Sequence, residues 1–493
     1  MSTQLAILPV VVPLLGAPLC ILLRIPRLVG LFAIVVATLS FIASCLLLLA
    51  VQNAGGLLIY EMGGWPAPWG IEYRIDYLNA YLILLVSAMG AIILVPAQTS
   101  IRRELQENRH TYFYTAYLLC LTGLLGILST GDAFNVFVFL EISSLSSYTL
   151  IALGSDRRAL TAAYQYLIMG TIGATFIIIG VGLMYMMTGT LNMFDLFQRL
   201  PEVHNSRTVL SAVGFFIVGV CLKLALFPLH LWLPNAYAYA PSVATAFLAA
   251  TSTKVAVYVL IRCMFSIFGI EFVDTVLPLQ QIFIVLALAG IFAASISAIY
   301  QLNIKRLFAY SSVAQIGYMI LGLAIGTELG ITATMLHLFN HALMKAALFL
   351  AIGSVVYRIG SAQLNHYAGL GKKMPLTMAA LVVGGLSLIG VPLTVGFVSK
   401  WYLVVALIDK GWWLVVVLVL ISSLLAVIYV WRIIEWVYFV PPRIIVDEVR
   451  EAPLSQLIPV WLLVGANIYF GLDTTLTVGV SEAAAAALFG MLP

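Results

Sequence analysis

Long apolar runs separated by short polar connections dominate the pattern along this chain. A membrane-spanning helix needs about 20 mostly apolar residues, and by this measure the sequence contains about 14 such runs. They fall near residues 5–23, 28–51, 77–100, 111–130, 132–153, 160–189, 208–235, 242–267, 277–300, 307–326, 330–357, 376–407, 411–438 and 453–480. Period-two alternation of the kind found in membrane barrels is absent, so the pattern predicts an all-α membrane protein.

Composition supports this class of protein and narrows the chemistry. The chain of 493 residues is 63% hydrophobic and 9% charged, whereas soluble domains carry about 25% charged residues. Its connections are too short to hold a soluble catalytic domain. The five cysteines are scattered through apolar runs without the spacing of a zinc or cluster site. We therefore expect no cofactor and no metal, and the net charge of +4 gives no reason to expect a nucleic-acid partner.

The basic residues fall mainly in alternate connections. The richer set is Arg24, Arg27, Arg102, Arg103, Arg109, Arg157, Arg158, Lys305, Arg306, Arg358, Lys372, Lys373, Arg443 and Arg450. The poorer set is Arg74, Arg199, Arg207, Arg262 and Lys410. The positive-inside rule assigns the richer set to the cytoplasm, which predicts a multi-pass protein of the cytoplasmic membrane with both termini outside. The first apolar run lacks a basic leader and is expected to remain as a helix.

Two of the expected spans contain helix-breaking residues. The segment CLKLALFPLHLWLPNAYAYAPSV interrupts the seventh span, and GGLSLIGVPLTVGFVSKW interrupts the twelfth. Each could be an ordinary proline kink. Their spacing of five spans instead favours two five-helix repeats of opposite topology, as in inverted-repeat transporters. The expected organisation is three N-terminal helices in 1–110, repeats in 111–267 and 277–438, and a C-terminal helix and tail in 439–493.

Few ionisable residues remain at membrane depth, and they form the candidate site. They are Glu141, Lys223, Lys254, His337, His341, Lys345 and Lys400, with His230, Arg432 and Glu435 as further candidates. A charge at the bilayer centre costs about 3 kcal/mol or more, so these groups predict a hydrated path inside the protein. His337, His341 and Lys345 recur every fourth residue and should share one helix face over roughly 12 Å. The sequence thus predicts a series of proton-transfer stations.

Each candidate also has a simpler explanation. A single buried lysine often reaches toward the membrane surface or forms a static ion pair. We expect Glu141 to pair with Lys223, because pairing and burial have opposite effects on the proton affinity of both groups. His230 could cap carbonyls freed by the break or transfer protons. Asp132 is expected to cap its helix. Arg432 and Glu435 could pair with each other or form an exit, and we favour the pair.

Four segments together resemble the antiporter-like subunits shared by respiratory complex I, membrane-bound hydrogenases and Mrp-type cation/proton antiporters. They are FLEISSLSSY, KLALFPLHLWLPNAYAYAPSVATAF, HLFNHALMKAALFL and LSLIGVPLTVGFVSKW, within about residues 70–440. The resemblance implies that Glu141 pairs with Lys223 and that Lys254 relays protons inward. It also implies that His337, His341 and Lys345 continue the path to Lys400, the terminal station. Some complex I members have Glu at that last position, so Lys400 excludes that branch.

The segment TSTKVAVYVLIR and the chain length look most like the D-type subunit of an Mrp antiporter, although Asn235 replaces an acidic residue found in many members. The resemblance therefore implies a proton-translocating subunit of a multisubunit Na⁺/H⁺ antiporter, with other membrane subunits as partners. A second hypothesis is the same module in a complex I-like NADH:quinone oxidoreductase or a membrane-bound hydrogenase. In that case any redox chemistry belongs to partner subunits. A third is a self-sufficient carrier, which the predominance of proton-exchangeable buried groups disfavours.

Overall fold

The chain folds into a bundle of long helices. The computed structural model describes residues 3–23, 25–270, 272–273, 278–441 and 449–490. The helices of the first half are α1 (Leu8–Leu22), α2 (Pro26–Asn53), α3 (Tyr77–Leu94), α4 (Ala97–Glu104), α5 (His110–Ser129), α6 (Ala133–Ala152), α7 (Arg158–Thr188), α8 (Met193–Val203), α9 (Arg207–Leu224), α10 (Trp232–Tyr239) and α11 (Ser242–Ile261). A π-helical turn, η4 (Arg262–Ile267), extends α11.

The second half contains the remaining helices. They are α13 (Leu279–Ile299), α14 (Ile304–Ala324), α15 (Glu328–Ile359), α16 (Leu370–Lys373), α17 (Pro375–Ile389), α18 (Val395–Asp409), α19 (Trp413–Tyr438), α20 (Leu454–Leu472) and α21 (Thr475–Phe489). Short 3₁₀ turns are η1 (Thr3–Ala6), η2 (Met62–Gly64), η3 (Glu107–Arg109) and η5 (Leu364–Tyr367).

The described helices account for the spans expected from the sequence. Twelve of them are long and apolar enough to cross a membrane, and they correspond to twelve of the expected spans. The other two expected spans are α1, which has 15 residues, and the pair α17 and α18, also 15 residues each. The predicted membrane-spanning helical class is therefore confirmed.

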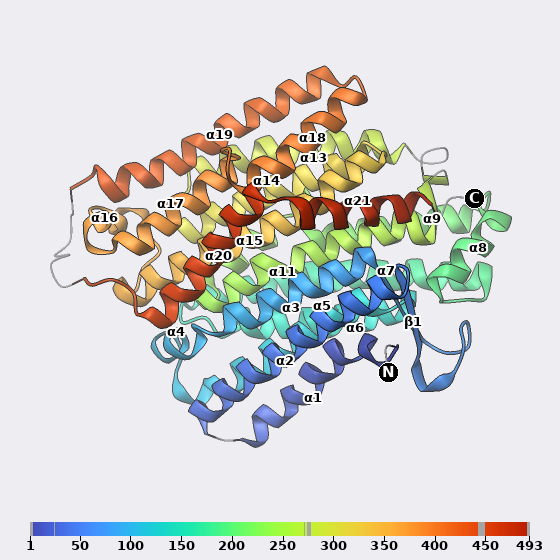
Figure 1. Ribbon diagram of the computed structural model, residues 1–493, viewed down its shortest axis with the longest axis horizontal. Helices are drawn as coiled ribbons and strands as arrows, with labels where there is room; N and C mark the ends of the chain where they lie inside the picture. The colour runs from blue at the N-terminus through green and yellow to red at the C-terminus, as the bar shows by residue number, and fades with distance from the viewer. Residues whose placement is uncertain (1–2, 24, 271, 274–277, 442–448, 491–493) are drawn as a thin grey trace.

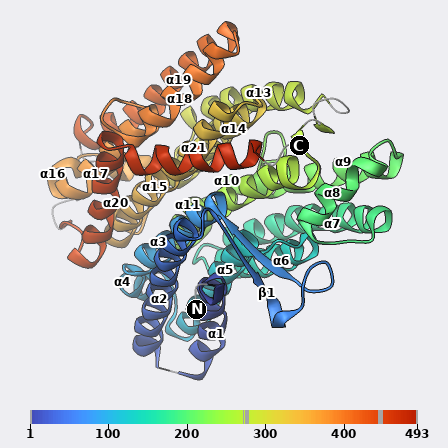
Figure 2. The same ribbon diagram turned by 45° about the vertical axis from the view of Figure 1, so that its right-hand side comes forward.

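Helices α11 and α15 lie in the middle of the bundle, side by side (Figures 1 and 2). The N-terminal helices α1, α2, α3 and α5 pack on one side, while α17, α18 and α19 lie on the other. Helix α15 also contacts α14, α20 and α21. These two central helices are thus shielded from lipid by protein, as a polar path requires.

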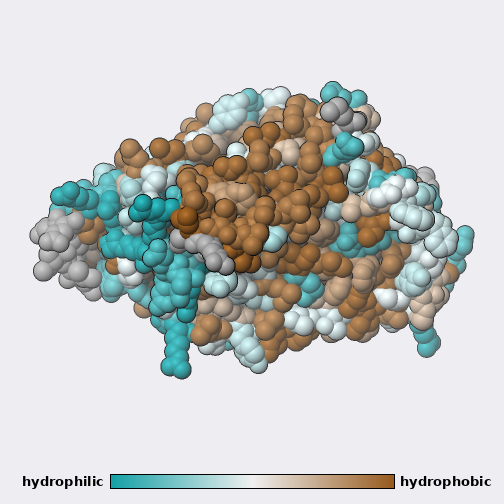
Figure 3. Space-filling view, turned by 90° about the horizontal axis from the view of Figure 1, so that it is seen from below, coloured by the Kyte–Doolittle hydropathy of each residue, from teal (hydrophilic) through white to brown (hydrophobic). Residues whose placement is uncertain are grey.

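The outer surface carries an apolar band. Figure 3 shows this band between a hydrophilic end on the left and a mixed polar end on the right. Exposed Leu31, Val35, Leu39 and Leu46 follow one face of α2, and exposed Leu420 and Leu424 belong to α19. Large exposed apolar areas of this kind mark contact with lipid or other membrane subunits.

One element was not predicted from the sequence. Strands β1 (Leu57–Glu61) and β2 (Glu72–Asp76) pair in antiparallel register, with Ile59 opposite Arg74, inside the connection between α2 and α3. The hairpin extends from one end of the bundle (Figure 2). In addition, the expected C-terminal tail forms α21, which packs against α15 and α3.

Both predicted helix breaks are present. Helix α9 ends at Leu224 because Ala225 adopts a left-handed conformation with φ of 60°. Helix α17 ends before Gly390, whose φ is 94°, and α18 starts five residues later at Val395. Both interruptions leave backbone groups inside the bundle. The inverted relationship between the two five-helix units, and the proposed unit boundaries, stay predictions.

Candidate functional site

Lys223 and Glu141 form the ion pair that the sequence predicts. Lys223 occupies the last turn of α9, next to the break, and its side chain is 4% exposed. Its Nζ lies 3.5 Å from the Glu141 Oε1 on α6 and donates to the Ser144 Oγ at 2.8 Å. The Glu141 side chain is 26% exposed, so it lies at the edge of this chain. The carboxylate is therefore compensated by an amine and is open to one side.

Lys254 lies fully buried in the middle of α11. Its Nζ donates to the Ala249 carbonyl of its own helix and approaches the Thr253 Oγ1 at 3.4 Å. The amine is also near enough to His341 and Lys345 of α15 for electrostatic interaction. The described side chains place no direct hydrogen bond between Lys254 and Lys223. A proton passing between these two amines therefore needs an intermediate group, and ordered water is the usual bridge between buried polar groups.

The predicted stripe on α15 shares one face. The rings of His337 and His341 stack at 6.1 Å with an interplanar angle of 7°. Lys345 donates to the Phe308 carbonyl at 2.9 Å and to the Ser311 Oγ at 2.5 Å, both on α14. Neither ring nitrogen of His341 has a hydrogen-bond partner among the described protein atoms. Buried polar atoms of this kind normally bind ordered water, which suits proton exchange.

The second break places Lys400 at the far end of this row. His337 Nδ1 lies 2.9 Å from the Oγ of Ser399, the residue before Lys400. The Lys400 Nζ donates to the carbonyls of Leu388 at 3.3 Å and Ile389 at 2.7 Å. These carbonyls belong to the last turn of α17, whose helical partners end at the break. The lysine thus satisfies backbone groups that lipid could not.

Polar and aromatic side chains complete the surroundings of Lys400. Its Nζ donates to the Ser423 Oγ of α19 at 3.1 Å and lies 5.0 Å from the centre of the Tyr318 ring. The Tyr318 hydroxyl hydrogen-bonds Ser422 at 2.6 Å, and its ring meets His337 edge-on at 5.8 Å. The sequence alone did not identify Tyr318, Ser422 or Ser423. Their only signal was a polar residue type within an apolar run.

The three further candidates, His230, Arg432 and Glu435, differ in how far their contacts match the predictions. His230 is buried, its ring stacks on Phe227 at 5.3 Å, and it interacts with the Pro228 backbone. This is compatible with either expected role. The predicted pairing of Arg432 with Glu435 is wrong: Arg432 Nη1 instead donates to the carbonyls of Ile299 and, at 3.3 Å, Gln301. Ile299 is the last residue of α13 and Gln301 follows two residues later, so the guanidinium lies where the negative end of the helix dipole attracts a cation.

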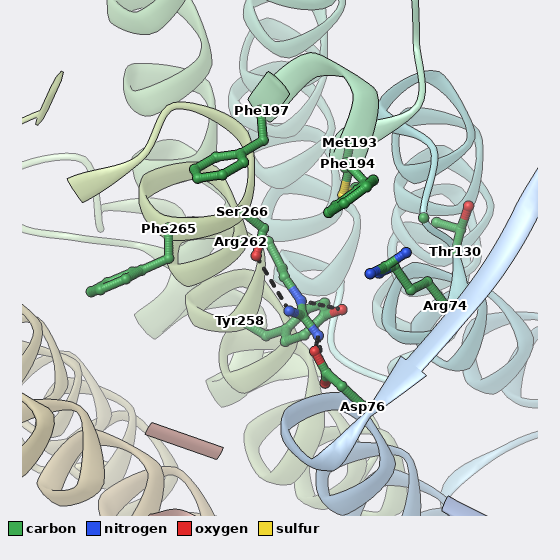
Figure 4. A pocket seen from close by; sticks show the side chains of 11 residues that line it. Arg74, Asp76, Thr130, Met193, Phe194, Phe197, Tyr258, Arg262, Phe265 and Ser266 are labelled. Carbon is green, nitrogen blue, oxygen red and sulfur yellow. Dashed lines mark hydrogen bonds and ion pairs between the residues drawn. The ribbon is translucent and has the colours of Figure 1, made fainter. Parts of the chain in front are cut away.

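A buried ion pair at the hairpin end of the bundle was not predicted. Arg262 Nη2 donates to both Asp76 oxygens at 2.7 Å, and Arg262 Nε donates to the Tyr258 hydroxyl at 3.0 Å (Figure 4). A cavity of about 40 Å³ adjoins this pair. The signal in the sequence was the spacing of Lys254, Tyr258 and Arg262, which lie four residues apart and so share a helix face. The charge pattern alone had placed Arg262 among the ordinary loop charges.

One predicted helix cap is present, and members of the two basic sets line different cavities. Asp132 caps α6 by accepting the Asn135 N–H at 2.7 Å, as predicted, and burial raises the pKa of its carboxyl. Arg103, Arg158 and Lys305 from the richer basic set line one cavity, whereas Arg74 and Arg262 from the poorer set line the cavity in Figure 4. Arg24 and Arg443 lie outside the described residues.

Known proteins share both the sequence and the fold. The chain is 42% identical over 490 residues to NADH-quinone oxidoreductase subunit N of Desulforudis audaxviator, covering 96% of each chain. It is 30% identical over 476 residues to the D subunit of the Na(+)/H(+) antiporter of Alkalihalophilus pseudofirmus, covering 95% of this chain and 94% of that one. A chain of the membrane-bound sulfane sulfur reductase, an archaeal respiratory membrane complex, superposes with a TM-score of 0.89 at 30% identity, covering 98% of each chain.

The family assignment follows from the central part of the sequence. Residues 130–426 match the family described as NADH:quinone oxidoreductase/Mrp antiporter, TM. This range contains all seven main candidate residues and both helix breaks, so the match covers the segments that suggested the resemblance. The chain belongs to the NADH:quinone oxidoreductase/Mrp antiporter transmembrane family.

Proposed function

We propose that this chain is the proton-translocating membrane subunit of a multisubunit monovalent cation (Na⁺)/H⁺ antiporter. The observation that carries the proposal is the row of buried amines and imidazoles from Lys223 through Lys254 and His341 to Lys400. Similarity to the antiporter D subunit over 95% of the chain supports the choice of complex. Protons move along Glu141, Lys223, Lys254, His337, His341, Lys345 and Lys400, and the parent complex supplies the cation coupling.

The ion pair at one end of the row can change the charge of the next group. A carboxylate 3.5 Å from an amine favours the charged form of that amine, and separation of the two favours the neutral form. A movement that separates Glu141 from Lys223 therefore releases a proton toward Lys254. Because the Glu141 side chain is 26% exposed at the edge of the chain, we propose that a neighbouring membrane subunit covers it and controls this separation.

Reconstitution of the assembled complex tests the proposal. Lys254→Met keeps the length of the side chain but removes its proton-accepting amine, so Na⁺-driven proton movement in proteoliposomes should fall at least about tenfold, the equivalent of 1.4 kcal/mol. The matched control is Lys410→Met, which changes an exposed lysine just after α18. Co-purification of the other subunits checks that both complexes assemble. Normal transport by the Lys254→Met complex would refute the proposed path.

A second candidate is a proton-pumping subunit of a complex I-like NADH:quinone oxidoreductase or a membrane-bound hydrogenase. The 42% identity to subunit N over nearly the whole chain favours this alternative. In that case this chain is not catalytic by itself and its partners carry the redox centres. Subunits that co-purify from the native membrane separate the two candidates. Flavin or iron–sulfur absorption in the complex, with proton movement independent of Na⁺, supports the redox-driven pump.

A further inference from the structure

A polar cavity opens at the predicted cytoplasmic end of the bundle. Its volume is about 450 Å³, enough for several water molecules. It lies where the junction between α10 and α11 meets the start of α14 and the end of α15. The charged residues that line it are Arg103 and Glu104 of α4, Asp156 and Arg158 before and in α7, and Lys305 of α14. None of these belongs to the row of candidate stations described above.

Two opposite charges flank the helix junction at this cavity. Lys305 is 4% exposed, and its Nζ donates to the Ala240 carbonyl at 3.1 Å. Glu104 accepts the Ser242 N–H at 2.8 Å through Oε2 and the Ser100 hydroxyl at 2.6 Å through Oε1. Lys305 and Glu104 are near enough to interact electrostatically. The junction thus holds a buried amine against the end of α10 and a carboxylate at the start of α11.

The other charges of the cavity are already compensated. Asp156 and Arg158 pair at 2.7 Å, and hydrogen bonds from the Arg158 guanidinium lower the pKa of Asp156 below its usual value. Arg103 lies over the Tyr357 ring and approaches the Arg358 carbonyl at 3.4 Å. Both arginines are exposed. Lys305 is therefore the deepest of the cationic groups that line the cavity among the described residues.

Lys305 also connects to the row of stations. Lys345 donates to the Phe308 carbonyl at 2.9 Å, and Phe308 is three residues beyond Lys305 on α14. At 1.5 Å per residue the two positions differ by about 4.5 Å along the helix. Lys345 itself belongs to α15, but the α14 carbonyl that holds its amine thus lies about one turn beyond Lys305. Lys305 therefore both lines the cavity and lies on the same helix as the acceptor of Lys345.

We propose that this cavity is the mouth through which protons enter from the predicted cytoplasmic side, with Lys305 as the loading group and Glu104 as its charge partner. The inference rests on the proposed proton path and adds its entrance. A hydronium ion in the cavity donates its proton to the neutral Lys305 amine and leaves water. The Lys305 ammonium then passes a proton to the neutral Lys345 amine, directly or through one water, and becomes neutral again.

The competing explanation is that Lys305 only caps the end of α10. Two substitutions separate a cap from a loading group. Lys305→Gln retains an N–H donor for the Ala240 carbonyl but has no amine to protonate. Lys305→Arg retains both charge and donors but does not release its proton near neutral pH. If Lys305 loads protons, both variants should slow proton uptake at least about tenfold, with assembly and thermal stability unchanged.

The proposal is overturned if the Lys305→Arg complex takes up protons at the normal rate. Arginine can still cap α10 but cannot load protons, so normal uptake would mean that Lys305 serves only as a cap. Lys410→Gln, at an exposed position, is the matched control. Lys254→Met, measured in the same vesicles, separates the two ideas. If uptake falls in Lys254→Met but stays normal in the Lys305 variants, protons do not enter at the cavity, although the proposed path through Lys254 stands. If uptake is normal in the Lys254→Met complex as well, the proposed path is also wrong.

Chemical modification of the cavity provides a second test, which leaves Lys305 unchanged and so does not depend on how Lys305 variants fold. Ser361 lines the cavity, and Ser361→Cys introduces a thiol that a bulky, membrane-impermeant maleimide can modify. Uptake by the same preparation is compared before and after complete modification from the predicted cytoplasmic side. We expect uptake to fall several-fold after modification. Unchanged uptake in fully modified protein would show that protons enter elsewhere.

Discussion

The buried lysines of the row are held mainly by neutral acceptors. Lys254, Lys345 and Lys400 donate to backbone carbonyls or serine and threonine hydroxyls, and the described residues give none of them an acidic partner. A permanent buried ion pair would keep the amine charged, because separating the charges is expensive. A neutral amine can still donate a hydrogen bond to a carbonyl. Both protonation states are therefore accessible to these three groups, as a relay requires.

Lys223 is the exception at this scale, and Glu141→Gln tests its pairing. Glutamine has the size of glutamate but no charge, so Lys223 keeps its bond to Ser144 and loses the attraction of the carboxylate. We expect proton movement by the reconstituted complex to fall about tenfold or more, which corresponds to one pK unit of altered proton affinity. Asp195→Asn removes a half-buried carboxylate outside the row, which pairs with the exposed Arg199, and should have little effect on proton movement. Full transport by Glu141→Gln would show that the pair is only structural.

At the scale of elements, the helix breaks bring the end of one helix to the side chains of the next. Gly396 in the first turn of α18 lies so close to α17 that an added Cβ would meet the Ser387 carbonyl oxygen at 1.7 Å. In addition, the Gly396 N–H donates to the Ser387 Oγ at 3.3 Å. These two contacts hold the end of α17 against the start of α18. The close approach allows Lys400 to reach the carbonyls of α17.

Gly396→Ala should therefore destabilise the protein by a few kcal/mol, since the backbone of α17 cannot move aside without strain. Thermal unfolding in detergent measures the effect. Gly465→Ala in α20 is the matched control, because its added Cβ would meet nothing within 4 Å. Equal melting temperatures for the two variants would contradict the proposed contact.

The elements that could be predicted from the sequence are those governed by local periodicity. Apolar runs of membrane length, proline and glycine interruptions, and the four-residue spacing of His337, His341 and Lys345 all depend on residues near one another in the chain. The hairpin could not be predicted, because its strands have only five residues and pair across a glycine- and proline-rich loop. Lys305 was grouped with loop charges, since burial by the α10–α11 junction depends on distant residues.

At the scale of the whole molecule, the two ends of the bundle differ in how their charges are held. The hairpin end contains the buried pair of Arg262 and Asp76, from residues 186 positions apart in sequence. The opposite end contains the open cavity with Lys305. Asp76 also caps α3 by accepting the Asn79 N–H at 3.1 Å. The pair therefore ties the hairpin and α3 to the end of α11.

Asp76→Asn isolates the contribution of this tie. Asparagine preserves the helix cap but leaves the Arg262 guanidinium buried without a countercharge, which typically costs about 3–5 kcal/mol. We expect a clear fall in the melting temperature, and partial recovery when Arg262→Met is added. Asp156→Asn breaks an exposed pair and should change stability by at most about 1 kcal/mol. An unchanged melting temperature for Asp76→Asn would show that the pair does not hold these elements together.

Membrane orientation determines which end faces the cytoplasm, and thiol labelling can decide it. Arg103, Arg158 and Lys305 of the richer basic set line the cavity, so the positive-inside rule predicts that this end faces the cytoplasm and the hairpin lies outside. Trp69, which is 89% exposed between the two strands, and Lys372, exposed on α16, report on the two ends. In intact cells a membrane-impermeant maleimide should modify Trp69→Cys, whereas Lys372→Cys should react only after permeabilisation. The unsubstituted protein is the control for the five native cysteines, four of which are buried. The reverse labelling pattern would place the Lys305 cavity on the outside and turn the proposed entrance into an exit.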